Sequence, residues 1–505
     1  MQNVFDLVKS LTGAELAYIK RTAIKVGQRP PKYIEVLEAI KEQEIYDEQQ
    51  LLKQFRREKF VKQFSVMKSY LVEVILDGLA ARQIIDNREM NLHRQISLLR
   101  VLRDKGLYGP SEKILHASLK EAREAEAFLE WLEILAIQRY WLINKFSSGS
   151  KNAVIENEEE TDYVLNLYKN FLTYQCINGE QVQISDKSFH IRRPGHLAEH
   201  EKVMAHPMIL DESKALSKRA MFELLMTKVL YHNILDNREE FFENAQRAFT
   251  IAHESLWLQK FDKLRLLSVY PQLMHAAFLT DRLQVLDATI NQLKKFEFTS
   301  AVQEMAAFAY GVPYSLVYLQ ATGQSERLSE TINETYLQVK KFGKQLRFDT
   351  RSQIIISCMS GALENGNYGK AVDWAVLFND FDNGERLDTR LIVDMMELIA
   401  HNELGQVLLV HNLSQSIYQR ALRWGEKGIF EDTFIRFFKK ITSGVEKEKM
   451  DEVCKKTMIA LEKILLGGVS SQNRTLYPLF VAYVQCRIVG KPYHVYLRQQ
   501  AISTQ

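Results

Sequence analysis

The stretch LLMTKVLYHNILDNREEFFENAQRAFTIA, residues 224–252, decides the fold of this 505-residue chain. Apolar residues recur at helical spacing before a polar turn at Asn237 and again after it. They are Leu224, Met226, Val229 and Leu230 on one side, and Phe242, Ala245, Phe249 and Ala252 on the other. The pattern predicts two antiparallel helices joined by a short turn, a helix hairpin.

The turn recurs along the chain with a step of 43 and then 39 residues. The markers are Asn237, Thr280, Gly323, Gly366, Gly405 and Gly444, with a less regular extension upstream through Gly195 and Gly149 to Gly106. One hairpin cannot bury both of its apolar stripes, so successive hairpins are expected to stack into a continuous core. The prediction is an all-α fold, a right-handed superhelical solenoid of roughly nine to eleven stacked antiparallel helix hairpins with a period of about 39–43 residues.

Composition agrees with a folded helical protein. Hydrophobic residues make up 46% and charged residues 26% of the chain, and there are only 9 prolines. The net charge of +3 is too small for a dedicated nucleic-acid binder. Four widely spaced cysteines without a CxxC pair favour a reducing compartment. With neither a signal peptide nor a long apolar run, the expected location is the cytoplasm, with no membrane contact and no cofactor.

Two segments resemble tetratricopeptide repeats. They are KGLYGPSEKILHASLKEA (Lys105–Ala122) and ENGNYGKAVDWA (Glu364–Ala375). Gly106 and Tyr108 in the first, and Gly366, Tyr368 and Ala371 in the second, occupy the positions of the turn glycine, the aromatic residue and the small residue of that family. The resemblance implies a tetratricopeptide-like array with lengthened helices; HEAT-type repeats are the alternative.

A longer resemblance covers most of the chain. The segments FDLVKSLTGAELAYIK from Phe5, FSVMKSYLVEVIL from Phe64, HPMILDESKALSKRA from His206, HNELGQVLLV from His401 and ALRWGEKG from Ala421 are similar to an uncharacterised family of bacterial cytoplasmic helical-repeat proteins. This resemblance implies the same helical fold and no particular activity.

Breaks in the apolar periodicity predict the domain organisation. Residues 147–160, SSGSKNAVIENEEE, are expected to form a flexible loop between an N-terminal helical array, residues 1–146, and a C-terminal solenoid, residues 161–505. A helix is expected from about Thr161 to Cys176, followed by an irregular segment at 178–206. Pro271 and Pro313, 42 residues apart, are expected to kink the first helices of consecutive hairpins.

The motif HLAEH offers one candidate metal site. His196, Glu199 and His200 follow the H-x-x-E-H order of inverzincin metalloproteases, in which two histidines one helical turn apart bind zinc. The motif follows Pro194 and Gly195, and nothing downstream identifies itself as the third ligand. A solvated helix start is therefore the favoured interpretation, and the predicted metal ligands are none.

The run KQFRREKFVK offers a candidate nucleic-acid patch. Its basic residues are Lys53, Arg56, Arg57, Lys59 and Lys62, and they alternate with Phe55 and Phe60. Cations beside aromatic rings can hold phosphates and stack bases. A helix with a buried aromatic side and a solvated basic side explains the same pattern and is favoured.

Tyrosines offer a candidate partner-binding surface. Tyr310, Tyr314 and Tyr318 recur every four residues, and Tyr231 and Tyr270 lie in the corresponding helices of the preceding repeats. In solenoids the first helix of each pair usually lines the concave face, where tyrosine provides contact area with a polar tip. A stripe at helical spacing also fits core packing, which is the favoured alternative.

The sequence contains no phosphate loop, dinucleotide fingerprint or nucleophile elbow, so no catalytic residue is predicted. The expected function is a non-catalytic scaffold, adaptor or regulator that holds a peptide or protein in a concave helical groove. The alternatives are a peptide-responsive regulatory protein, an RNA-binding solenoid and, last, a metal-dependent hydrolase using HLAEH. Partner identity and oligomeric state do not follow from the sequence.

Overall fold

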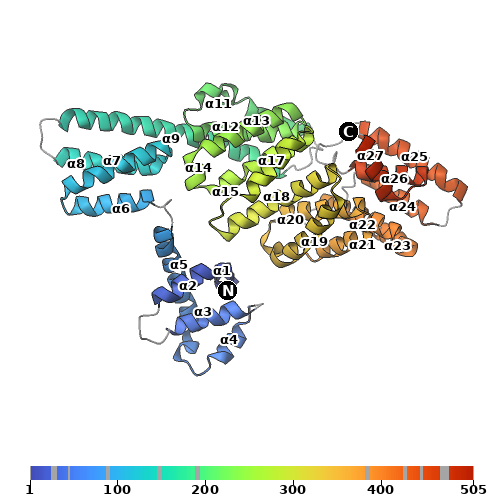
Figure 1. Ribbon diagram of the computed structural model, residues 1–505, viewed down its shortest axis with the longest axis horizontal. Coiled ribbons are helices and arrows are strands. Elements are labelled where there is room, and N and C mark those ends of the chain that lie inside the picture. Colours follow the sequence, from blue (N-terminus) through green and yellow to red (C-terminus); the bar gives the residue numbers. More distant parts are fainter. Residues whose placement is uncertain are drawn as a thin grey trace. The chain divides into compact units, whose positions relative to one another are not determined.

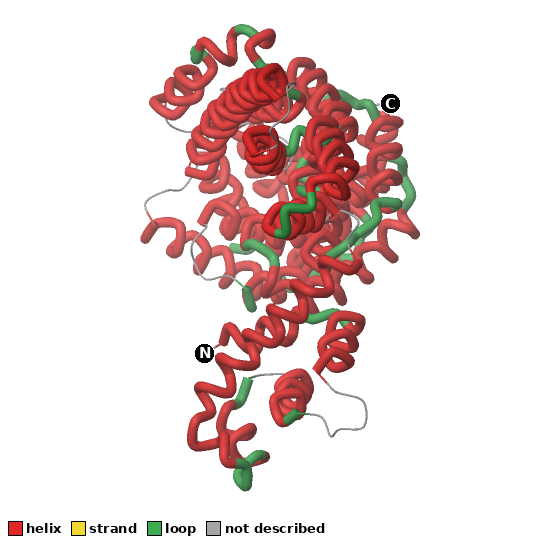
Figure 2. The backbone as a smooth tube through the Cα atoms, turned by 90° about the vertical axis from the view of Figure 1, so that its left-hand side faces the viewer, coloured by secondary structure: helices red, strands yellow, loops and turns green. Residues whose placement is uncertain are grey.

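The structure is a computed structural model that describes residues 2–23, 31–43, 46–86, 91–144, 150–187, 194–381, 387–424, 429–443, 447–466 and 477–503. Within these ranges every regular element is a helix, as Figure 2 shows, so the predicted all-α class is confirmed. None of the described helices is both long enough and apolar enough to span a lipid bilayer. The chain divides into two compact units, Met1–Lys169 with Thr299–Ala301, and Asn170–Phe298 with Val302–Gln505.

The first unit begins with helices that share one apolar core. They are α1 (Gln2–Ser10), α2 (Gly13–Ala23), α3 (Lys32–Glu42), α4 (Glu48–Gln54), η1 (Lys59–Gln63) and α5 (Phe64–Asp86). Thr12 and Glu15 cap α2 reciprocally: the Thr12 amide donates to Glu15 Oε2 at 2.7 Å, and the Glu15 amide donates to Thr12 Oγ1 at 3.2 Å. The helix therefore begins at a capping box.

The rest of the first unit is built from α6 (Asn91–Asp104), α7 (Tyr108–Glu124), α8 (Phe128–Asn144) and the first half of α9 (Ser150–Lys187). Helix α6 contacts both α7 and α8, and α7 also packs on α8. The side chains of α8 are apolar on most sides, and Phe128, Ile134 and Leu135 are fully buried. A helix of this kind needs neighbours on more than one face, which α6 and α7 supply.

The second unit contains the second half of α9 and all later helices (Figure 1). Their bounds are α10 (Pro194–Met204), α11 (Pro207–Leu210), η3 (Glu212–Lys214), α12 (Lys218–Ile234), α13 (Arg238–Glu254), α14 (Leu256–Lys260), α15 (Lys263–Leu267), α16 (Val269–Leu279), α17 (Leu283–Lys294), α18 (Ala301–Ala321), α19 (Ser325–Phe342), η4 (Gly343–Gln345), α20 (Phe348–Glu364), α21 (Tyr368–Asn379), α22 (Leu387–Glu403), α23 (Val407–Trp424), α24 (Ile429–Ile441), α25 (Lys447–Leu466), α26 (Tyr477–Val489) and α27 (Tyr493–Ser503). Most contacting pairs are neighbours along the chain, as in α12 with α13 and α20 with α21.

Eight of the described inter-helix turns share one backbone geometry. Each contains a residue with φ between +53° and +74°, at Gly106, Glu126, Asp236, Asp281, Gly323, Gly366, Gly405 and Gly490. At Gly366 the amide of Asn367 donates to Ala362 O at 2.8 Å and the amide of Gly366 donates to Leu363 O at 3.1 Å. These bonds define a Schellman motif, which ends a helix by satisfying its last carbonyls.

The turns predicted at Asn237, Thr280, Gly323, Gly366 and Gly405 are confirmed, and so is the upstream turn at Gly106. The upstream extension is wrong at Gly195, which is the second residue of α10 rather than a turn between helices. Gly149 and Gly444 lie outside the described residues. The turn at Glu126 was not predicted, because the turns were identified by glycine, asparagine and aspartate, and none of these residues lies at that turn.

The loop expected at 147–160 is wrong for residues 150–160, which form the first turns of α9. Polar contacts replace the missing apolar stripe there. The buried Asn157 donates through Nδ2 to Leu135 O at 3.0 Å and to Gln138 Oε1 at 2.9 Å, and accepts from Arg139 Nε at 2.9 Å. The two units accordingly divide within α9, after Lys169, rather than at a loop.

The irregular segment expected at 178–206 is also largely helical. The end of α9 covers 178–187 and α10 covers Pro194–Met204, while 188–193 lie outside the described residues. Of the two proline sites, Pro313 lies inside the continuous helix α18. Pro271 lies in the first turn of α16, where the helix restarts after Ser268, so the first helix of that hairpin is divided into α15 and α16 rather than kinked.

The last hairpin packs back on earlier helices of the second unit. The Tyr368 hydroxyl and His494 Nδ1 lie 3.0 Å apart across 126 residues of chain, and α27 contacts α20. Asn402 Nδ2 donates to the Tyr483 hydroxyl at 2.6 Å, and the rings of Phe430 and Tyr477 stack 3.8 Å apart. Packing in a simple array involves neighbouring repeats alone. The large apolar side chains of α26 explain the difference, because they need cover on both sides.

Candidate functional site

Two of the five predicted surface tyrosines belong to the core. Tyr270 and Tyr314 are buried, and each bonds a histidine: the Tyr270 hydroxyl lies 3.0 Å from His253 Nε2, and the Tyr314 hydroxyl lies 3.1 Å from His275 Nδ1. Burial raises the pKa of Tyr270 to about 12 and lowers the pKa of His275 to about 4. Both pairs are therefore neutral and structural, which corrects the expectation that these two tyrosines could line a groove.

The other three tyrosines, Tyr231, Tyr310 and Tyr318, are half-buried. Burial raises the pKa of Tyr310, and the positive charges of Arg347 and Arg265 oppose that rise. These three residues remain candidates for partner contact.

The basic run is solvated, and its aromatic residues are packed. Lys53, Arg56, Arg57, Lys59 and Lys62 are all exposed. The ring centroid of Phe60 lies 5.6 Å from that of Phe55 and 6.3 Å from that of Phe64, in the core of the first unit. The segment is not one helix, because α4 ends at Gln54 and η1 begins at Lys59. With the rings packed together, stacking between these phenylalanines and nucleic-acid bases has no geometric support.

The HLAEH motif lies on α10, so its helical spacing is correct. Glu199 is exposed and His200 is fully buried, which corrects the expectation of a wholly solvated helix start for His200; the side chain of His196 lies outside the described residues. Among the residues that the structure describes, no group of three or more His, Cys, Asp or Glu side chains is arranged to hold a metal ion.

A polar pocket of about 320 Å³ lies between α12 and α13 under the α11–η3 segment, all within the second unit. Its walls are Met204, Ile209, Leu210, Glu212, Lys228, His232, Glu240, Glu243, Asn244 and Arg247. Helix periodicity brings these residues together: Lys228 and His232 are one turn apart on α12, and Glu240, Asn244 and Arg247 follow one another on α13. The turn at Asp236 folds the two helices so that both sets face the same space.

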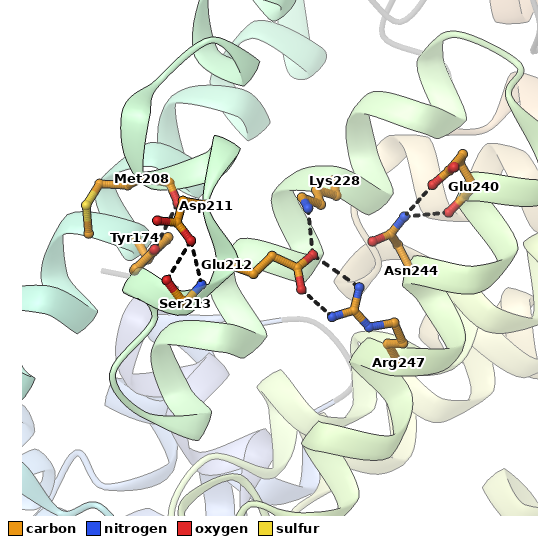
Figure 3. Close-up of polar contacts among 9 residues, drawn as sticks. All are labelled: Tyr174, Met208, Asp211, Glu212, Ser213, Lys228, Glu240, Asn244 and Arg247. Atoms are coloured by element: carbon orange, nitrogen blue, oxygen red, sulfur yellow. Dashed lines mark hydrogen bonds and ion pairs between the residues drawn. The ribbon is translucent and has the colours of Figure 1, made fainter.

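One end of the pocket is electrostatically satisfied. Glu212 accepts from Lys228 Nζ at 2.6 Å and from Arg247 through two bonds, Nη1 at 3.2 Å and Nη2 at 2.5 Å (Figure 3). The guanidinium of Arg247, followed by the ammonium of Lys228, lowers the pKa of Glu212 to about 2. Tyr174 holds the same segment from α9 by donating its hydroxyl to Met208 O at 2.9 Å.

The other end of the pocket presents acceptors. Glu240 and Glu243 are exposed and form no ion pair with any described residue. Asn244 is 4% exposed, and its Nδ2 donates to Glu240 O at 2.7 Å and weakly to Glu240 Oε2 at 3.5 Å. Because both partners are acceptors, the amide nitrogen faces them, and Oδ1 points away from Glu240, as Figure 3 shows.

The chain matches no protein-family model, and no curated protein is similar to it. The local chemistry of this surface therefore carries the functional argument. The pocket could not be predicted from the sequence, because its walls come from three separate segments and its charged residues have the ordinary spacing of solvated helix faces. The one local signal was Asp211, whose Oδ1 accepts from the Ser213 amide at 3.0 Å and starts η3.

Proposed function

We propose that the chain is a non-catalytic, tetratricopeptide-like helical-repeat scaffold. It binds a peptide or protein segment along a surface formed by the first helix of each hairpin in its second unit. The main support is the repeated turn. In successive hairpins the first helix ends at a residue in the left-handed conformation, and the same pair of backbone hydrogen bonds closes the turn. Hairpins joined alike tend to stack alike, and stacked first helices make an extended binding surface.

The half-buried tyrosines fit this role. Tyr231, Tyr310 and Tyr318 are half-buried, so each is partly held by packing and partly accessible. A tyrosine held in this way loses little conformational entropy when it contacts a partner, and interfaces are enriched in such residues. Tyr310 and Tyr318, which lie on the same helix α18, form the proposed centre of the contact surface.

Site-specific photo-crosslinking tests the proposal. A benzophenone side chain placed at Tyr310 or Tyr318 should capture the same protein in cells, and one placed at Leu337, 69% exposed on the second helix α19, should not. The captured protein, purified, should bind the chain directly. Tyr310→Ala should weaken that binding about tenfold in a variant that still unfolds cooperatively, and Leu337→Ala should leave the binding unchanged. Equal capture at Leu337, or binding unchanged by Tyr310→Ala, would refute the proposed surface.

A further inference from the structure

The strongest unexplained feature is the acceptor-rich end of the pocket between α12 and α13. Both cations at the opposite end already bind a carboxylate, because Lys228 and Arg247 form ion pairs with Glu212. An incoming anion would have to displace Glu212 from two cations that already satisfy it. The pocket is therefore poorly suited to a carboxylate or phosphate.

Three groups at the other end can accept hydrogen bonds. They are the carboxylates of Glu240 and Glu243 and Asn244 Oδ1. Asn244 is more than nine-tenths buried, and no described group donates to its Oδ1. His232 lines the same pocket, and burial lowers the pKa of this imidazole, which favours its neutral form and adds no positive charge there. Such a set matches a ligand that brings several N–H donors and a positive charge.

The apolar wall of the pocket gives the shape of that ligand. Met204, Ile209 and Leu210 line the side contributed by α10 and α11, and Leu210 is 73% exposed. Lysine and arginine carry a hydrocarbon stem that packs along apolar surface while the charged head reaches polar groups. A small inorganic cation would leave this apolar wall without a contact.

We propose that this pocket binds the lysine or arginine side chain of a partner peptide, with its stem against Met204 and Leu210 and its cationic head between Glu240, Glu243 and Asn244. The inference rests on the proposed scaffold function and adds the chemistry of the segment that the scaffold recognises. The pocket has a volume near the lower end for ligand sites, about 300 Å³, which suits one side chain rather than a large cofactor.

The test uses the full chain with methyl-labelled methionine and isoleucine, observed by NMR. The probes are blocked single residues: N-acetyl-lysine methylamide, N-acetyl-arginine methylamide, the uncharged norleucine analogue and the acidic glutamate analogue, together with free spermidine. The lysine or arginine probe should shift the methyl signals of Met204 and Ile209 in a saturable manner, and the norleucine and glutamate probes should not. Binding of spermidine without either amino-acid probe would overturn the peptide assignment.

Variants locate the effect. Glu240→Gln with Glu243→Gln should weaken binding of the cationic probe at least tenfold, while Glu239→Gln, on the same helix but outside the pocket, should leave it within twofold. Unchanged binding in the double variant, or an equal loss in Glu239→Gln, would overturn the site. If the probe binds at the pocket but no partner is crosslinked at Tyr310, the scaffold proposal alone is refuted. If a partner is confirmed but the double variant binds it with unchanged affinity, the pocket proposal alone is refuted.

Discussion

Replacing Gly366 by alanine should loosen the last helix of the chain, although the two lie far apart in sequence. Gly366 has φ +72° in the turn between α20 and α21, and a Cβ added there would lie 3.0 Å from Cγ and 3.1 Å from Nδ1 of His494. Gly405 provides a matched control, because it has φ +74° in the next turn and nothing within 4 Å of its added Cβ.

The expected magnitudes follow from this contrast. Alanine in the left-handed region costs about 1–2 kcal/mol, so Gly405→Ala should lower the free energy of unfolding by that amount. Gly366→Ala carries the same backbone cost and must also move the His494 ring, which breaks its 3.0 Å bond to the Tyr368 hydroxyl. A lost hydrogen bond of this kind adds about 1 kcal/mol, and the disturbed packing adds to it.

Hydrogen exchange monitored by mass spectrometry separates the two effects. Gly366→Ala should speed amide exchange in α27 (Tyr493–Ser503) by about five- to tenfold, the equivalent of about 1 kcal/mol or slightly more, and Gly405→Ala should leave α27 unchanged. In a His494→Ala background the excess effect of Gly366→Ala should disappear. If both glycine variants speed amide exchange in α27 equally, the absence of a side chain at Gly366 is not what allows α27 to pack on α20.

Three further predictions concern buried groups and one strained turn. Burial raises the pKa of Asp394 from 3.8 to about 6 against the opposing charges of its arginine partners, so the folded state favours the protonated acid. The contribution of Asp394 to the free energy of unfolding should therefore be full below about pH 4 and should fall by roughly 3 kcal/mol as the pH rises through 6. Thermal melts across that range should show this pH dependence in the wild-type chain and lose it in Asp394→Asn. Asn157→Ala should leave Arg139 without its 2.9 Å acceptor and speed hydrogen exchange over the first turns of α9, at a cost of about 2 kcal/mol; unchanged exchange there would contradict the polar anchoring of α9. Glu126→Gly should raise the melting temperature of the first unit, because glutamate at φ +53° is strained by about 1 kcal/mol, and a lower temperature would mean that its side chain contributes more than the strain removes.

Helix periodicity and turn chemistry were enough to predict the all-α class and six of the eight described turns that contain a left-handed residue. Those features are local: an apolar stripe needs a spacing of three or four residues, and a Schellman turn needs one residue that tolerates positive φ. The prediction failed at α9, where Asn157 anchors the helix through polar bonds to α8. A polar anchor has the composition of a loop, so only the partner residues in space reveal it.

The turn residues explain why marking glycines was only partly sufficient. Glycine occupies the left-handed position at Gly323, Gly366 and Gly405, while aspartate occupies it at Asp236 and Asp281. Aspartate tolerates positive φ through local hydrogen bonding, so either residue can end the helix in the same way. The backbone geometry is thus the same from turn to turn even where the turn residues differ.

The pocket shows the limit of sequence reasoning about function in a chain of this kind. Its chemistry depends on which charges are already neutralised: Glu212 is matched by two cations, whereas Glu240 and Glu243 are not. In the sequence all three are ordinary acidic residues of a polar segment. Since the turn at Asp236 sets which residues of α12 face α13, the same local geometry that builds each hairpin also decides which of its charges stay available for a ligand. An all-helical protein can in this way form a pocket of defined chemistry without any local motif, through the pairing of side chains between adjacent helices.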